Sequence, residues 1–383
     1  MGSLIRRREQ KRRNQRIGAG ALAIILALVS FVALTRAFRT AERPADEPKP
    51  KPQGIFSEVG GWIAYGNEEG IWAVNPTPGS MPTDRIQLSE RAGEPLAWSS
   101  DGSKLLILRK VTDPNRDPAP DLDLFVLNAD GTETRLTRES DWNWNDTIVP
   151  GSISPAGSKV VYALLGGTEN PTNLRTGIYI VDIEGGTPRL LLAGPHPPHH
   201  MAHPTFSPDG EQIAYFDGGG DHGNKLWVMN ADGSGVRVLI DQEFGHVDDL
   251  GWSPDGSRLA FSALYGGGVW IVGVDGSGLT EVVPHGGAPR WSPTGSRLAF
   301  QSPGGIWVIN GVGSGLRQVA PVGRNPVWSP DGSRIAYELS PGTLETVRWN
   351  GSDVQRIGVR ESGPWAESGP WNPLPLSGPG THD

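Results

Sequence analysis

Three histidines occupy one position in a recurring pattern, and this is where the sequence points to chemistry. Each stands six residues before an aromatic residue that opens a repeated motif: His200, His246 and His285 precede Phe206, Trp252 and Trp291. Imidazoles joined by a carboxylate bind zinc, manganese or nickel. Asp248 lies two residues after this position in the second copy. The spacing therefore predicts a metal site of His200, His246 and His285, within a ligand site that also includes Asp248.

Two other interpretations of the histidines stay open. Duplication of neighbouring repeats copies a polar loop residue without giving it a function. Clustered imidazoles also gain charge below about pH 6.5, which would change the charge of an acidic surface. The first of the three loops is especially rich in histidine, since His196, His199 and His203 surround His200.

A second candidate site is the short segment 141–146, with the sequence DWNWND. It places Trp142 and Trp144 between acidic residues. Exposed indoles stack on sugar rings or on a partner, whereas a buried indole packs in the core. The segment is therefore a candidate ligand-binding loop, with core packing as the alternative.

Known catalytic motifs are missing. The chain has no cysteine, which excludes disulfides, thiol nucleophiles and cysteine-ligated zinc. It also lacks the nucleophile motif G-x-S-x-G, the phosphate loop GxxxxGK[ST] and the zinc motif HExxH. Its Asp-Gly pairs lack the spaced oxygen ligands of a calcium loop. We therefore expect no catalytic residue and no cofactor, with a divalent metal as the exception that the histidines allow.

The composition favours a folded protein made mostly of tight turns. The 383 residues include 53 Gly and 34 Pro, but also 14 Trp and 37% hydrophobic residues, enough to bury a core. Residues beyond 40 carry 25 basic and 41 acidic side chains. This excess of acid argues against binding DNA or RNA through phosphate neutralisation.

The N-terminal residues indicate a membrane anchor. Residues 1–16 are strongly basic, and residues 17–35 are uncharged and apolar. Nineteen helical residues span about 28 Å, close to the hydrocarbon thickness of a bilayer. The basic flank predicts a cytoplasmic N-terminus and an exported remainder. A cleaved signal peptide is the alternative. Residues 36–53, rich in Pro and charge, are expected to form a stalk.

Seven copies of one turn organise the rest of the chain. WSPDGSRLAF at 252 recurs in varied form, with copies opening at Phe56, Trp98, Ile153, Phe206, Trp291 and Trp328. Ser-Pro-Asp-Gly has the residue preferences of a tight turn. An apolar strand follows each turn, then an alternating strand such as IWVIN at 306, and in several units an Asn-x-Asp-Gly hairpin turn.

About 43 residues per unit, with four strands each, is typical of a propeller blade. The predicted fold is therefore an all-β, seven-bladed propeller over residues 54–358, with six blades or a β-sandwich as alternatives. Residues 359–383 are predicted to be a disordered tail, unless one of their two Pro-Trp segments folds back into the first blade.

The W-S-P-D-G-x-x-[IL]-A-[FY] frame resembles the PD40 repeat of TolB-like β-propellers over residues 54–358. The resemblance implies a propeller outside the cytoplasm. TolB proteins, however, carry six blades and a separate α/β domain in place of the helix and stalk. Seven-bladed oligogalacturonate lyases are similar in having a His-lined metal site in the propeller channel.

Taken together, these features predict a single-pass membrane protein that displays a propeller outside the cytoplasm. We expect it to bind a protein, peptide or glycan of the cell envelope without catalysis. The alternative is a metal-dependent lyase or hydrolase that acts on a saccharide at the channel mouth. A sensor role is less favoured, because residues 1–16 offer only a basic patch on the other side of the membrane.

Overall fold

The computed structural model describes residue 56 and residues 61–76, 85–111, 121–138, 147–165, 176–194, 199–219, 222–245, 247–263, 268–340 and 343–357. Within these ranges the chain forms strands joined by turns. The segments predicted as cytoplasmic (1–16), membrane-spanning (17–35) and stalk (36–53), and the tail 359–383, lie outside the described residues.

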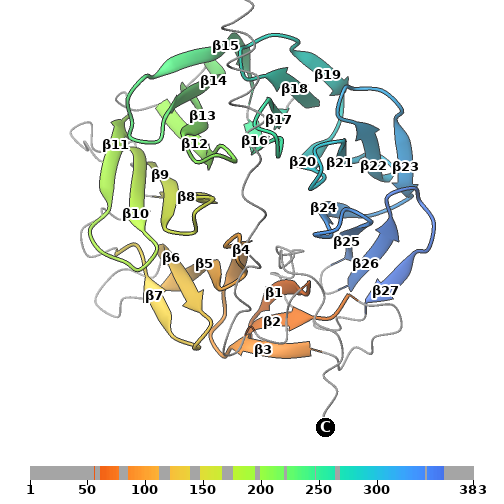
Figure 1. The fold of residues 1–383 in the computed structure, drawn as a ribbon, viewed down its shortest axis with the longest axis horizontal. Coiled ribbons are helices and arrows are strands. Elements are labelled where there is room, and N and C mark those ends of the chain that lie inside the picture. Colours follow the sequence, from red (N-terminus) through yellow and green to blue (C-terminus); the bar gives the residue numbers. More distant parts are fainter. Residues whose placement is uncertain are drawn as a thin grey trace, which may run out of the picture. The chain divides into compact units, whose positions relative to one another are not determined.

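Seven separate antiparallel sheets surround one axis, as predicted from the repeats (Figure 1). The first three blades contain the following strands: β1 (Ile63–Asn67), β2 (Gly70–Val74) and β3 (Arg85–Ser89); β4 (Glu94–Trp98), β5 (Lys104–Val111), β6 (Asp121–Asn128) and β7 (Glu133–Arg135); β8 (Thr147–Ile153), β9 (Lys159–Leu165), β10 (Gly177–Asp182) and β11 (Arg189–Ala193).

The remaining four blades each contain four strands. They are β12 (His199–Phe206), β13 (Gln212–Gly219), β14 (His222–Asn230) and β15 (Arg237–Phe244); β16 (Val247–Trp252), β17 (Arg258–Ala263), β18 (Val269–Gly273) and β19 (Thr280–Val283); β20 (Gly287–Trp291), β21 (Arg297–Ser302), β22 (Gly305–Asn310) and β23 (Arg317–Ala320); β24 (Arg324–Trp328), β25 (Arg334–Ser340), β26 (Thr343–Arg348) and β27 (Gln355–Ile357).

Strand order in each blade follows the chain, and the first strand of blades 2 to 7 lies nearest the axis (Figure 1). In blade 1 the described strands are the second, third and fourth of the pattern. The aromatic residue that opens this unit, Phe56, is fully buried and packs edge-on against Trp98 of blade 2, with 4.9 Å between ring centroids. The opening aromatic of the weakest repeat thus joins the core between blades 1 and 2.

The hydrophobic core of the described residues lies between blades, because each sheet buries both faces against its neighbours. Each of the seven boundaries between successive blades has its own apolar cluster. At the last boundary, Ile63 and Tyr65 of blade 1 pack with Ala336 and Leu344 of blade 7. This contact closes the ring, and the alternative of six blades or a sandwich is therefore wrong.

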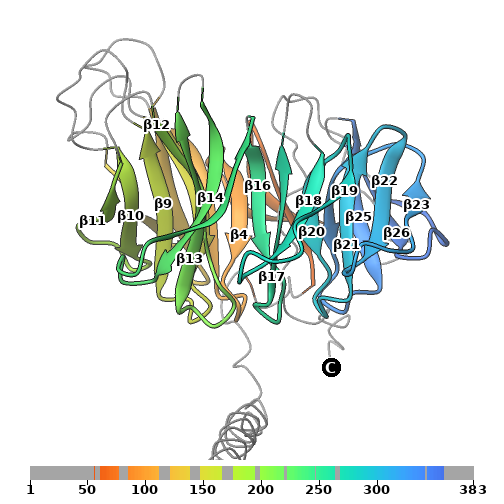
Figure 2. The same ribbon diagram turned by 90° about the horizontal axis from the view of Figure 1, so that it is seen from above.

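The antiparallel order gives the propeller two different faces (Figure 2). One face, here the turn face, carries the Ser-Pro-Asp-Gly turns between first and second strands and the hairpin turns between third and fourth strands. The other, the loop face, carries the connections between second and third strands and the entries into each first strand. Of the three predicted histidines, His285 and the backbone of His200 belong to the loop face, and His246 lies outside the described residues.

Candidate functional site

The repeated turns satisfy their own polar groups. In blade 5 the N–H of Gly256 donates to the carbonyl of Ser253 at 2.8 Å, and the Ser253 hydroxyl donates to Asp255 Oδ1 at 2.6 Å. That carboxylate also accepts from the N–H of Ser257, and the N–H of Arg258 donates back to Ser253 Oγ. The hydroxyl of Ser253, as the main cause, lowers the pKa of Asp255 below its usual value.

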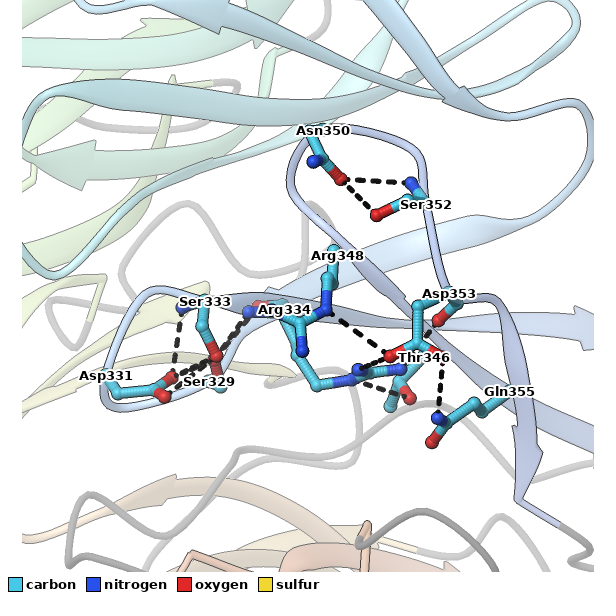
Figure 3. A network of polar contacts seen from close by, with 10 residues as sticks. All are labelled: Ser329, Asp331, Ser333, Arg334, Thr346, Arg348, Asn350, Ser352, Asp353 and Gln355. Carbon is cyan, nitrogen blue, oxygen red and sulfur yellow. Dashed lines mark hydrogen bonds and ion pairs between the residues drawn. The ribbon is translucent and has the colours of Figure 1, made fainter.

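Blade 7 links its two turns through an arginine (Figure 3). Arg334 follows the Ser-Pro-Asp-Gly turn and pairs with Asp353 beyond the hairpin turn, with 2.7 Å between Nη1 and Oδ2. Its Nη2 donates to the Asp353 carbonyl and its Nε to Thr346. Because the turn face uses its donors and acceptors internally, we assign it a structural role.

The aromatic anchors fix the innermost strands relative to each other. The indole N–H of three anchors donates to a carbonyl in the preceding blade, always that of the residue just before the preceding anchor: Trp252 to Thr205 at 3.1 Å, Trp291 to Gly251 at 3.2 Å and Trp328 to Arg290 at 2.9 Å. These bonds hold neighbouring blades in register at the axis and so position whatever the innermost strands carry on the loop face.

Four successive innermost strands share a strained residue, which sequence analysis did not identify. The non-glycine residues three positions before the anchors of blades 4 to 7 take φ between 48° and 53°; they are His203, Asp249, Ala288 and Asn325. Each lies at a shift in pairing with the second strand. Positive φ is uncommon outside glycine, and such bulges cluster near functional sites, where they redirect a side chain. We call these four residues the bulge arc.

The bulge arc begins at blade 4, and the residues at the same register in blades 2 and 3 give the reason. The same register holds Pro95 and Pro150, whose rings keep φ negative. Both strands still shift their pairing at this position, so the bulge itself is shared. The left-handed backbone is thus confined, among the described strands, to the side of the ring formed by blades 4 to 7.

Charged side chains accompany the bulge arc. Asp249 pairs with Arg290 on the innermost strand of the next blade, with 2.7 Å between Oδ1 and Nη1, and the two side chains are 26% and 44% exposed. Nε and Nη2 of Arg290 donate to no residue that the structure describes. In the other blades the residue just before the anchor is smaller, namely Ala97, Ser152, Thr205, Gly251 and Val327. Arg290 is therefore the one long side chain at this register in blades 2 to 7.

A second ion pair lies in blade 7. Arg324 is 52% exposed, and its guanidinium contacts both oxygens of Glu338, which is fully buried, at 3.0 and 3.2 Å. Beside it, the N–H of Asn325 donates to Gln301 of blade 6 at 3.0 Å. The loop face near the axis thus holds two exposed guanidinium groups whose orientation is set by carboxylates.

The structure describes only part of the set predicted from sequence. His285 is exposed in the turn that enters β20, and its carbonyl accepts a hydrogen bond from Ser302. The backbones of His200 and Asp248 belong to β12 and β16, but their side chains lie outside the description. His246, Trp142 and Trp144 are outside the described residues. The shared histidine site therefore stays a prediction.

Within the described residues, no three histidine or acidic side chains are close enough to hold a metal ion. The predicted metal ligands His200 and His246 lie beyond that test. The pair Asp249–Arg290 had no signal in the sequence, because the two residues are 41 positions apart and meet only across a blade boundary. The bulge arc had a weak one: two of its four residues are Asn or Asp, which tolerate positive φ better than others.

Comparisons with known proteins agree with this geometry. Residues 157–341 match the TolB beta propeller domain family, PD40. A stretch of 175 residues is 29% identical to an uncharacterized protein of Agrobacterium fabrum, and covers 43% of this chain and 56% of that relative. The chain thus spans little more than half the length of this relative.

Solved structures share the fold at low sequence identity. An oligogalacturonate lyase in complex with manganese superimposes with a TM-score of 0.55 and 17% identity, over 77% of this chain and 88% of the lyase. TolB from Acinetobacter baumannii is similar with a TM-score of 0.48 and 16% identity, over 83% of this chain and 67% of that one. At 17% identity the likeness to the lyase concerns the fold alone.

The seven sheets, the repeated turns and the closed ring define a repeat-built β-propeller. Residues 157–341 of this propeller match the TolB beta propeller domain model, so the propeller is TolB-like in its repeats. The part of the chain that the structure describes contains no helix long and apolar enough to cross a bilayer, and residues 17–35 are not in that part.

Proposed function

We propose that the chain is a membrane-anchored propeller outside the cytoplasm that binds a protein, peptide or envelope glycan on its loop face. The observation that carries the proposal is the bulge arc with its charge pair Asp249–Arg290. Positive φ at one register in four adjacent blades costs backbone energy, and strained residues of this kind cluster at binding and catalytic sites. A preorganised, partly exposed polar surface is what a recognition site requires.

Arg290 is the best-placed recognition group. Its Nη1 contacts Asp249 and donates to the Pro289 carbonyl, whereas Nε and Nη2 donate to no described residue, so a planar acceptor such as a carboxylate or an amide carbonyl can bind there. The described charged groups here, Arg290 and Asp249, form an ion pair that can hold a ligand by hydrogen bonds. Binding without covalent chemistry is therefore the function that this site supports best.

The anchoring part of the proposal rests on the basic residues 1–16 and the apolar residues 17–35. Because the chain has no cysteine, one introduced thiol is a unique label. In intact cells, a membrane-impermeant maleimide should label Ser314→Cys on the turn face but leave Ser3→Cys unlabelled until lysis. Labelling of Ser3→Cys first would reverse the proposed orientation.

Site-specific photo-crosslinking tests the binding surface. A photoreactive residue at His285 or Asn325 of the full chain in its native membrane should give a discrete adduct. The same residue at Ser314 on the turn face serves as control and should give none. Arg290→Ala should reduce the loop-face adduct at least fivefold. Adducts from Ser314 alone, or adducts that Arg290→Ala leaves unchanged, would contradict the proposal.

A metal-dependent lyase or hydrolase acting on a saccharide is the second candidate. The likeness in fold to an oligogalacturonate lyase solved with manganese favours it, together with the exposed position of His285 on the loop face. The full chain, purified without chelators, would then hold one divalent ion per molecule. His246→Ala or His285→Ala should release that ion. A metal content below a tenth of an ion per chain would count against this candidate.

A further inference from the structure

A cavity on the loop face lies apart from the bulge arc. Its volume is about 110 Å³, and its lining comes from the ends of strands in blades 1 and 2. Asn67 ends β1, residues 92–94 lead into β4, Leu108 and Lys110 lie near the end of β5, and Leu122 near the start of β6. An apolar cavity of about 150 Å³ holds a benzene molecule, so this space suits one small apolar group.

The walls approach each other closely. A methyl group added to Gly66, beside Asn67, would lie 1.8 Å from the carbonyl oxygen of Gly93. The chain entering β4 is therefore pressed against the end of β1 by backbone contact, which side-chain rotation cannot relieve. The cavity between these elements is a formed part of the propeller.

Asn67 carries an unused donor in this lining. Its side-chain oxygen accepts hydrogen bonds from the N–H groups of Glu69 and Gly70 at 2.9 and 3.0 Å, and from the indole of Trp72 at 3.3 Å. Three donors fix the orientation of the amide, because a flipped group would point its NH₂ at them. The residue is 6% exposed, and its Nδ2 has no hydrogen-bond partner among the described residues.

An orphaned buried donor costs about 1–3 kcal/mol unless a ligand or water accepts from it. The rest of the lining indicates which ligand fits. Leu108, Leu122 and Ala92 are apolar, Glu94 is half-buried, Lys110 is exposed, and none of the described lining residues is aromatic. Sugars are usually held by aromatic platforms with several polar groups, whereas an aliphatic side chain beside a peptide carbonyl matches one amide donor in an apolar space.

We propose that this cavity receives an aliphatic side chain of a protein or peptide partner, whose adjoining main-chain carbonyl accepts a hydrogen bond from Asn67 Nδ2. The inference rests on the proposed binding function and names a peptide as the partner class. It places a second contact point on the loop face, in blades 1 and 2. This contact point is mainly apolar, whereas the bulge arc in blades 4 to 7 carries a charge pair.

The test uses the full chain in neutral detergent with labelled leucine methyl groups, titrated with N-acetyl-leucine-N-methylamide. The methyl signals of Leu108 and Leu122 should shift and saturate, while those of the buried Leu298 in blade 6 stay unchanged. N-acetyl-glycine-N-methylamide, which lacks the side chain, should bind at least tenfold more weakly. N-acetylglucosamine tests the glycan alternative and should leave both signals in place.

Two variants make the test decisive. Asn67→Asp keeps the acceptor oxygen and the size of the side chain but replaces the donor, so affinity for the leucine probe should fall about fivefold or more. Leu122→Trp fills the cavity and should abolish the shifts, with the Leu298 signals as a check that the variant folds.

The inference is overturned if the leucine probe leaves Leu108 and Leu122 unshifted, if Asn67→Asp binds it as well as the parent chain does, or if the sugar shifts these signals instead. Each result leaves the crosslinking test of the arc unaffected. Loss of loop-face adducts, conversely, would remove the proposed function without changing the response of the cavity to the probes.

Discussion

Ser152 of blade 3 accepts a hydrogen bond on its hydroxyl oxygen from the backbone N–H of Phe206 in blade 4, with 2.8 Å between the two atoms. Blade 4 opens with Phe where the next three blades open with Trp, so it lacks the indole donor that joins each of blades 5 to 7 to the blade before it. The serine hydroxyl provides the link between innermost strands that the missing indole cannot make.

Ser152→Ala should therefore loosen the boundary between blades 3 and 4. The Phe206 N–H loses its partner, and we expect the free energy of unfolding to fall by about 1 kcal/mol. Urea denaturation of the full chain in detergent measures this. Ser314→Ala, on an exposed turn, is the control and should change stability little. Equal stability of both variants would show that the bond contributes nothing.

Trp291→Phe should remove the corresponding bond between blades 5 and 6. The Gly251 carbonyl loses its indole donor, and we expect a loss of about 1–2 kcal/mol. Trp307→Phe is the matched control, because the buried Nε1 of Trp307 has no hydrogen-bond partner among the described residues. Removing that nitrogen should cost less than removing the one of Trp291. The opposite order of stabilities would contradict the role assigned to the anchors.

Gly151→Ala should be among the most damaging small substitutions. An added Cβ would lie 2.3 Å from the carbonyl oxygen of Val161 and 2.4 Å from that of Pro204, in the same blade and in the next one. Both are backbone atoms, so the strands must separate, and we expect a loss of more than about 2 kcal/mol. At Gly251 an added Cβ meets nothing within 4 Å. Gly251→Ala should therefore be mild, as a thermal melt of both variants can show.

The propeller should lose stability in mild acid. Hydroxyl groups of Ser207 and Ser253 lower the pKa of Asp209 and Asp255 in the folded state. The unfolded chain, with an ordinary aspartate pKa of about 3.9, then binds more protons than the folded chain near that pH. Their contribution is thus complete above the unfolded pKa and is lost as the pH falls through the folded pKa.

Urea midpoints measured from pH 7 down to pH 3 check this dependence. Asp255→Asn should lower stability at pH 7 and flatten the loss in acid, whereas Ser314→Ala, which removes no carboxylate, should leave the slope unchanged. Parallel curves for the parent chain and Asp255→Asn would show that the turn carboxylate is not responsible.

The repeat alone determined most of the fold. Ser-Pro-Asp-Gly closes a turn through contacts within six residues, so each copy carries its own geometry, and seven copies at about 43 residues specify seven blades. The sequence also explains why blades 2 and 3 do not share the bulge arc. Pro95 and Pro150 exclude positive φ from the register at which blades 4 to 7 adopt it.

Ring closure and the features of the loop face were decided only by tertiary structure. The packing of Ile63 against Ala336 joins the two ends of the propeller, and no local pattern distinguishes a closed ring from an open arc. The pair Asp249–Arg290 joins two blades, and the cavity beside Asn67 lies between blades 1 and 2, whereas the bulge arc forms where the first strand of each blade pairs with the second. The turns depend on contacts between residues close in the sequence, whereas a binding surface depends on how separate blades are brought together about one axis.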